Sequence, residues 1–335
     1  MNYRYLLLLF VSTIFVPQFL IADSSISASS EIERLKILEE KQLSAFQAYT
    51  VATEDRAIGP GSIRNYGDFM YAEIEPLFKT LYGNDFSDFD LESLSYQGLE
   101  ARLKAFRIAG FFRNSGSILM HMLDIVDEMY TRGDVSQEIA SRMFGDLIRA
   151  RNFDAARTFS ARFSDLPLEP VPEIIDPYAG DRSEGRKTVW QVSEDGSTLT
   201  RSEIRLKGPR IVVYASLSCA HSRRFMAELP GQEELSEIFG EHAVWIEPQD
   251  NDLQMQVVAA WNRQHPDQAL QFMHAFAEWP EYEDWATPAF YFVENGKIKK
   301  SFTGWPNWNE VIDGVERIGL ADPGEIMPPA EIVAE

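Results

Sequence analysis

The chain of 335 residues has very little cysteine: Cys219 is the single one. A lone cysteine forms no disulfide bond within its own chain, so a fold held together by internal disulfides is excluded. In an exported protein an unpaired cysteine indicates a bond to another chain or a reactive thiol. A free cysteine is also a common inert core residue. The count therefore leaves three roles open for Cys219.

Basic residues are also scarce, with 31 Lys and Arg against 52 Asp and Glu, and the formal net charge is −21. A polyanion repels the phosphate backbone of nucleic acids, so we expect no nucleic-acid partner. Anionic membrane surfaces are disfavoured for the same reason. The simplest role of the excess negative charge is to keep the protein soluble.

Long apolar runs are absent except at the N-terminus. There, Arg4 precedes the apolar stretch 6–16, Pro17 interrupts it, and the small residue Ala22 ends the segment. This pattern predicts a signal peptide over residues 1–22 and a periplasmic or secreted protein. The alternative is an uncleaved anchor, which would be the chain's one tie to a membrane. No cysteine stands directly after the apolar segment, where a lipoprotein would carry its lipid, which argues against a lipoprotein.

Several motifs that mark other chemistries are missing. The sequence has no glycine-rich phosphate loop and no Gly-x-Ser-x-Gly elbow. His121, His242, His265 and His274 do not follow the spacing of metal ligands, and no second cysteine could join them. We therefore expect no cofactor and no bound metal.

The length suggests two domains, and the 45% of hydrophobic residues is enough for two cores. After a serine-rich leader at 23–30, apolar residues recur at helical spacing through 31–165, which predicts an all-α domain. Its expected helices after the first are 66–82, 91–113, 117–131, 136–149 and 154–163. The proline-rich segment 166–186 reads as a linker.

Beyond the linker the pattern changes to alternating strands and helices, which predicts an α/β domain over 187–320. Expected strands are 187–192, 198–206, 211–214, 243–247, 289–293 and 297–303. Expected helices are 222–229, 233–239, 253–263, 268–277 and 308–318. The remainder, 321–335, reads as a loose acidic tail.

Two segments of this second domain resemble a known family. Residues 210–225 run from a buried strand into Cys219-Ala220-His221-Ser222 and a helix, and residues 286–292 contain Thr287-Pro288 before another strand. Both resemble thioredoxin-like proteins and are most similar to the periplasmic disulfide-bond oxidoreductases and isomerases. The resemblance implies a central mixed sheet flanked by helices, with a helical insertion. It does not extend to the N-terminal helices, which differ from the family's usual dimerisation domain.

The resemblance implies specific roles for five residues. Cys219 would be a nucleophile at a helix N-terminus, where the unpaired N–H groups favour the thiolate. Ser222 would donate to the sulfur, and His221 would add positive charge or be an ordinary exposed residue. Thr287 and a cis Pro288 would form an edge that binds an extended substrate segment. A trans proline that begins a strand is the alternative.

This sequence departs from the family at two positions. Ser222 stands where the family has a second cysteine, so Cys219 cannot complete a dithiol cycle within the chain. Three chemistries remain: isomerisation resolved by the substrate's own thiol, exchange with a small thiol, and reduction of a sulfenic acid completed by an external thiol. Val213 stands where some members have a buried acid, so rapid proton transfer is less expected.

The leading hypothesis is therefore an exported monothiol protein, whose partners would be exported proteins with cysteines and, in one variant, a small thiol. The alternative is a redox-inactive thioredoxin-fold scaffold whose helical domain binds an assembly partner, since a fold does not by itself imply an activity. The four tryptophans Trp279, Trp285, Trp305 and Trp308 flank Pro288 in the sequence and could pack in the core or line a groove beside the thiol.

Overall fold

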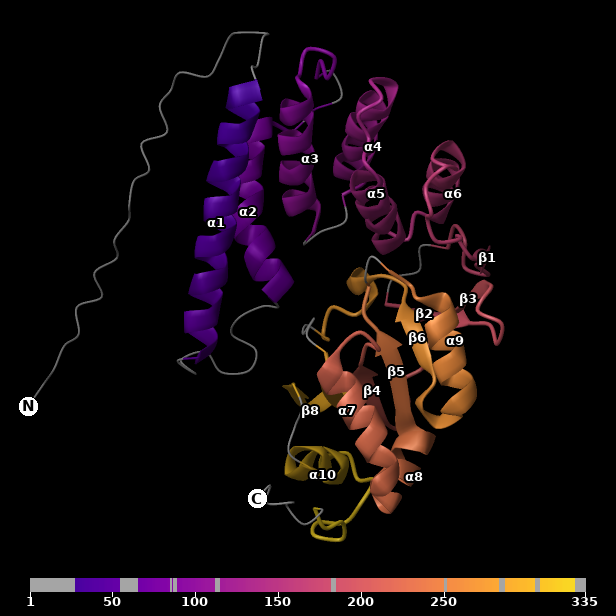
Figure 1. Ribbon diagram of the computed structural model, residues 1–335. Helices are drawn as coiled ribbons and strands as arrows, with labels where there is room; N and C mark the ends of the chain where they lie inside the picture. Colours follow the sequence, from indigo (N-terminus) through magenta and orange to yellow (C-terminus); the bar gives the residue numbers. More distant parts are fainter. Residues whose placement is uncertain are drawn as a thin grey trace, which may run out of the picture.

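The computed structural model describes residues 28–328 apart from 55–65, 85, 87–88, 112–114, 182–184, 250–251, 283–286 and 305–307. The predicted signal segment 1–22 lies outside the described residues. The described chain has a helical region followed by a mixed sheet with helices, as the sequence predicted, and Figure 1 shows the helices as a row above the sheet. Among the described residues, no helix combines the length and the apolar composition needed to cross a membrane.

The helical region follows the predicted pattern with small shifts in the ends. The first helix already includes the last residues of the expected leader, and the second continues through Pro76 without a break. The region is built from α1 (Ala28–Glu54), α2 (Tyr66–Tyr82), α3 (Tyr96–Phe111), α4 (Gly116–Thr131), α5 (Gln137–Arg149) and α6 (Phe153–Arg162).

A cluster of charged side chains lies inside the helical core and joins α1 to α3 and α4. Arg102 is 1% exposed and donates through Nη1 to Glu31 (3.3 Å) and through Nε to His121 Nε2 (2.8 Å). Burial, followed by the nearby Arg102 charge, lowers the pKa of His121 to about 3, so the imidazole is neutral near pH 7 and accepts this hydrogen bond. Arg102 therefore fixes α1 in place from the middle of α3.

The sheet has the strand order β1-β3-β2-β6-β5-β4-β7-β8. Its strands are β1 (Glu173–Ile175), β2 (Thr188–Val192), β3 (Thr198–Glu203), β4 (Pro209–Tyr214), β5 (Ala243–Glu247), β6 (Leu270–Met273), β7 (Ala289–Glu294) and β8 (Lys297–Thr303). β4 is parallel to β5 and antiparallel to β7. With a helix after β4 and another after the β7–β8 hairpin, this is a thioredoxin-like arrangement.

The central strands are buried on both faces. Successive side chains of a strand point to opposite sides of the sheet, so alternate residues of β4 enter two different cores. On one face Ile211 and Val213 join the large core beneath α8 (Glu233–His242), α9 (Met255–Gln264) and α10 (Trp308–Arg317). On the other face, Val212 and Tyr214 pack with Trp279 and Tyr282. This burial explains why β4 reads as a continuous apolar run rather than an alternating one.

One predicted element is wrong: residues 268–277 do not form a helix. They contain β6, flanked by the short 3-10 turns η2 (Pro266–Gln268) and η3 (Phe276–Glu278). β6 lies between β5 and β2 and is parallel to the first and antiparallel to the second. The pattern of a short apolar run fits a strand and a helix equally well. This run is a strand because it pairs with β5 on one side and β2 on the other.

The predicted linker takes part in the fold. Within 166–186, β1 pairs in parallel with β3 at the edge of the sheet. The turn between α5 and α6 also docks on the sheet. Arg151 donates to the Met273 carbonyl at the end of β6 (3.2 and 3.3 Å), and Gln249, beyond β5, donates to the Arg149 carbonyl. Phe153 packs edge-on against Trp190 of β2, with ring centroids 5.7 Å apart. The helical region is therefore held at the carboxyl ends of β5 and β6.

We expect Arg102→Ala to lower the free energy of unfolding by about 3 kcal/mol, because it leaves Glu31 in the core with less compensation. Arg34 keeps one hydrogen bond to Glu31, which places the loss at the low end of the range for broken buried pairs. Urea unfolding followed by circular dichroism measures the change. Lys104→Ala is the matched control on the same helix, since its pair with Glu100 is exposed, and it should cost less than about 0.5 kcal/mol. A loss below about 1 kcal/mol for Arg102→Ala would contradict the proposed role.

Candidate active site around Cys219

Cys219 lies at the turn between the central strand β4 and α7 (Ala220–Glu228). It is the N-cap residue of α7, with extended backbone angles (φ −84°, ψ 122°), and its side chain makes no cap hydrogen bond to the helix. The positive end of the helix dipole and the N–H groups of the first turn therefore face the sulfur. Cys219 thus lies at a helix N-terminus, which is the position that the resemblance implied. Its side chain is partly exposed.

Thr287 and Pro288 lie beside this thiol although they are far away in the sequence. β7, which begins directly after Pro288, pairs with β4 so that Ala289 lies opposite Tyr214. The Thr287–Pro288 peptide bond is cis, which is the form that the resemblance implied. The Cys219 thiol donates to the Thr287 carbonyl oxygen at 3.0 Å. The pairing of two adjacent strands thus brings the two predicted segments together.

The pKa of Cys219 is lowered from the ordinary thiol value by its hydrogen-bond donors. Burial raises the pKa, but hydrogen bonds from the Thr287 side chain, from the backbone and side chain of Ser222 and from the His221 backbone together outweigh it. The Thr287 carbonyl acts in the opposite direction, since it accepts from the protonated thiol. The sulfur therefore has one contact that suits the neutral form and several that suit the thiolate.

Ser222 and His221 differ in how they meet the sulfur. Ser222 is fully buried, and its hydroxyl both contacts Cys219 and accepts from the Ser216 N–H at 3.3 Å. It lies one helical turn after Cys219, where a second thiol would be within reach of the first. His221 is exposed and acts on Cys219 through its backbone N–H. Any role of the His221 imidazole stays a prediction.

A buried acid that the sequence reading missed lies beneath the turn. Glu247 ends β5, is 8% exposed, and accepts from the Ser216 hydroxyl at 2.6 Å. The same hydroxyl lies 2.8 Å from that of Ser218. Val213 is buried in the sheet on β4. The acid beneath the turn, Glu247, comes from the neighbouring strand β5 instead. Because β4 and β5 are parallel, a polar residue at the end of an apolar run was the signal that could have revealed it.

Of the tryptophans near Pro288, Trp279 is buried in the core on one face of the sheet and Trp308 is partly buried against the core on the other. Trp279 is 2% exposed and contacts Tyr282 edge-on, with ring centroids 5.4 Å apart. Trp308 lies 5.8 Å from the ring of Phe225 on α7. Trp285 and Trp305 lie outside the described residues. The described pair therefore packs against the sheet and α7.

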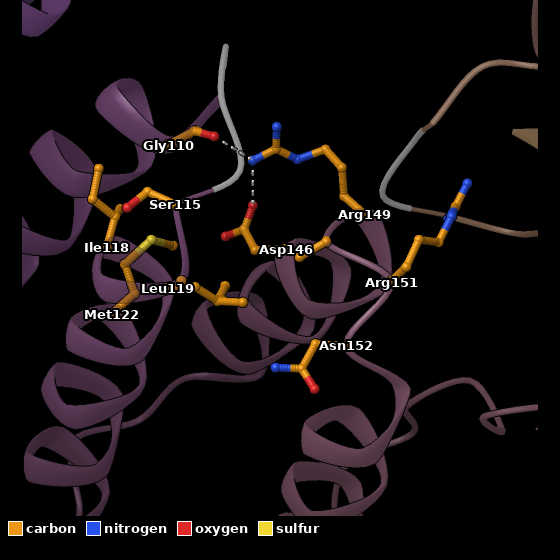
Figure 2. A pocket seen from close by; sticks show the side chains of 11 residues that line it. Gly110, Ser115, Ile118, Leu119, Met122, Asp146, Arg149, Arg151 and Asn152 are labelled. Atoms are coloured by element: carbon orange, nitrogen blue, oxygen red, sulfur yellow. Dashed lines mark hydrogen bonds and ion pairs between the residues drawn. The ribbon is translucent and has the colours of Figure 1, made fainter. Parts of the chain in front are cut away.

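A cavity of about 350 Å³ lies in the helical region, away from these residues. It is lined by the end of α3, the start of α4 and the α5–α6 turn, and Figure 2 shows Arg149 between Gly110 and Asp146. Arg149 donates to the Gly110 carbonyl at 3.3 Å and lies 3.8 Å from the Asp146 carboxylate. None of the predicted site residues lines this cavity. Across the described part of the chain, no three His, Cys, Asp or Glu side chains are grouped so that they could hold a metal.

Comparison with known proteins gives one distant structural likeness to report. No family model matches the chain. No curated protein matches it either. Among solved structures, a thioredoxin-like protein from Bacteroides caccae is similar over 71% of this chain and 92% of its own, with 9% sequence identity and a TM-score of 0.27. A likeness at this level supports no conclusion about activity, so the site rests on its own geometry.

We expect Ser222→Ala to raise the pKa of Cys219, because the thiolate loses a side-chain donor. At pH 7 the alkylation rate with iodoacetamide should fall roughly threefold to tenfold, in line with the loss of one hydrogen bond to a charged group offset by the remaining donors. The rate should be measured from pH 5 to pH 10, where its rise follows the thiolate fraction. Ser218→Ala is the matched control, since the Ser218 hydroxyl bonds to Ser216. An unchanged pH profile in Ser222→Ala would show that Ser222 does not stabilise the thiolate.

Proposed function

We propose that this protein is an exported monothiol that exchanges disulfides through Cys219. The observation that carries the proposal is the placement of a partly exposed thiol at the N-terminus of α7 among donors that lower its pKa. The thiolate is the reactive form in disulfide exchange, and a lowered pKa increases its fraction near neutral pH. An inert core cysteine would be buried among apolar groups instead, where its pKa would rise.

The first step is capture of a partner disulfide. The Cys219 thiolate attacks one sulfur, a bond forms between the two sulfurs, and the partner's own S–S bond breaks. The electron pair leaves with the second partner sulfur, which departs as a thiolate and takes a proton from water. With a sulfenic acid as partner, the same attack forms the mixed disulfide and releases the hydroxyl oxygen as water after protonation.

The second step needs a thiol from outside the chain, because Cys219 is the only cysteine. In isomerisation, a different thiolate of the partner attacks the partner sulfur of the mixed disulfide, which forms a new S–S pairing in the partner and releases the Cys219 thiolate, so there is no net oxidation. In the other two routes, an external thiol attacks and restores the Cys219 thiolate. Each route leaves the protein unchanged after one cycle.

The edge beside the thiol is the proposed substrate platform. Thr287 is partly exposed next to the sulfur, whereas Pro288 is buried behind it. The Pro288 carbonyl is already bonded to the Gly304 N–H at 2.8 Å, so the hairpin holds this edge from behind. An extended segment of a partner protein could pair with the backbone at Thr287 while its cysteine meets Cys219. The predicted signal segment 1–22 would deliver the protein to a compartment where such disulfides form.

A scaffold function is the second candidate, and one observation favours it. The thiol donates to the Thr287 carbonyl, an arrangement that holds the sulfur in its neutral form. In that case the helical region docked on the sheet would be the working part and would bind an assembly partner. Reaction of Cys219 with a small disulfide at neutral pH distinguishes the two functions, since a scaffold needs no such reaction.

We expect the protein to accumulate a stable mixed disulfide when it is incubated with excess 2-hydroxyethyl disulfide, detectable as a mass increase of the intact chain. Ser222→Cys should instead pass through this adduct to an internal disulfide, because residue 222 already contacts the sulfur from the next turn of α7. Cys219→Ser is the control and should form no adduct. If the folded wild-type chain stays unmodified while a free cysteine peptide reacts, the thiol function is wrong and the scaffold function is favoured.

A further inference from the structure

The segment around Cys219 is free of acidic residues in a chain that is otherwise rich in them. From Ile204 to Ala227 the sequence contains no Asp or Glu, whereas the whole chain carries a net charge of −21. The first turns of α7 hold three basic residues directly after the thiol: His221, Arg223 and Arg224. The local charge at the proposed site is therefore opposite in sign to that of the molecule.

Arg223 is folded back towards the turn that carries the thiol. Its side chain is exposed, and Nη1 donates to the Leu217 carbonyl oxygen at 2.6 Å. Leu217 lies in the turn between β4 and α7, two residues before Cys219. The guanidinium group is thus held over the turn that carries the thiol, and it presents its charge on the solvent side of the site.

Arg224 is adjacent in sequence but faces another way. Its Nε donates to Glu228 at 2.7 Å, an i,i+4 pair on the surface of α7, so its charge is compensated locally. Glu247, an acid that contacts this turn, is buried and accepts from the Ser216 hydroxyl. Among the described residues at the turn, the guanidinium of Arg223 and the positive end of α7 are therefore the charges that an approaching solute meets first.

We propose that the small partner of Cys219 is an anionic thiol and its disulfide, in which a carboxylate near the sulfur pairs with Arg223. This inference rests on the proposed function and specifies its external thiol. The carboxylate would be recognised by a charge-assisted hydrogen bond to the guanidinium, whose planar fork suits that group. In the exchange, a bond forms between Cys219 Sγ and one partner sulfur, the partner disulfide breaks, and its other half leaves as an anionic thiolate that is protonated by water.

The net charge of the whole protein would favour a cationic disulfide over an anionic one. At low ionic strength, a net charge of −21 attracts cationic solutes and repels anionic ones. A preference for an anionic disulfide would therefore have to come from charges close to the thiol. At a partly solvated site, one charge a few ångströms from the ligand changes a rate by roughly threefold to tenfold.

The test compares three small disulfides that differ in charge: cystamine (cationic), 2-hydroxyethyl disulfide (neutral) and 3,3′-dithiodipropionate (anionic). Second-order rates of adduct formation on the full chain are divided by the rates of an end-blocked cysteine peptide, which removes intrinsic reactivity. We expect the normalised rate to be highest for the anionic disulfide, by roughly fivefold over the cationic one, and this preference should shrink in 1 M NaCl.

Two variants at Arg223 and one at its neighbour make the test specific. Arg223→Gln should remove the anionic preference, and Arg223→Glu should reverse it, when each rate is divided by the rate of the same variant with the neutral disulfide. Arg224→Glu makes the same charge change one residue away and should leave the preference in place. A cationic preference in the wild type, or equal effects of Arg223→Glu and Arg224→Glu, would overturn the inference. A thiol that reacts with none of the three disulfides would instead refute the proposed function.

Discussion

The burial of β4 on both faces determines where the thiol lies. Ile211 and Val213 face one core while Val212 and Tyr214 face the other, and β5 and β7 hold the strand on its two sides. Packing on both faces and pairing on both sides fix the position of β4. The turn that follows β4 and the start of α7 therefore have a defined position as well. The N-terminus of α7 therefore meets Cys219, and the antiparallel neighbour β7 brings Thr287 to the same point. The donors that lower the pKa of the thiol depend on this arrangement.

The helical region is held at the same end of the sheet as the thiol, where the central parallel strands have their carboxyl ends. β4, β5 and β6 are parallel, so Glu247 and Met273, which end β5 and β6, and Cys219, which follows β4, lie at the same end of the sheet. The α5–α6 turn binds the backbone at this end through Arg151. A partner that reached the thiol would therefore approach the helical region as well. This gives the helices a place in either candidate function, as a wall beside the substrate or as the binding part of a scaffold.

Much of the fold could be predicted from the sequence because its elements carry strong local signals. Amphipathic spacing predicted the helices of the first region, and the apolar run before Cys219 predicted the buried strand. The short segment around Leu270 was misread as helix because four residues of mixed pattern contain too little periodic information. The strand at 173–175 was missed because a proline-rich stretch resembles a linker, and its pairing with β3 depends on residues that follow it in the chain.

The sequence by itself determined the chemical identity of the site. With one cysteine, and serine three positions later, the chain has no second thiol that could complete a dithiol cycle, whatever the fold. Only the tertiary structure decided what surrounds that sulfur. Thr287 meets it through strand pairing, Glu247 lies beneath its turn through the parallel register of β5, and Arg223 bonds to the Leu217 carbonyl of the same turn. These are contacts between separate elements, and local sequence patterns do not encode them.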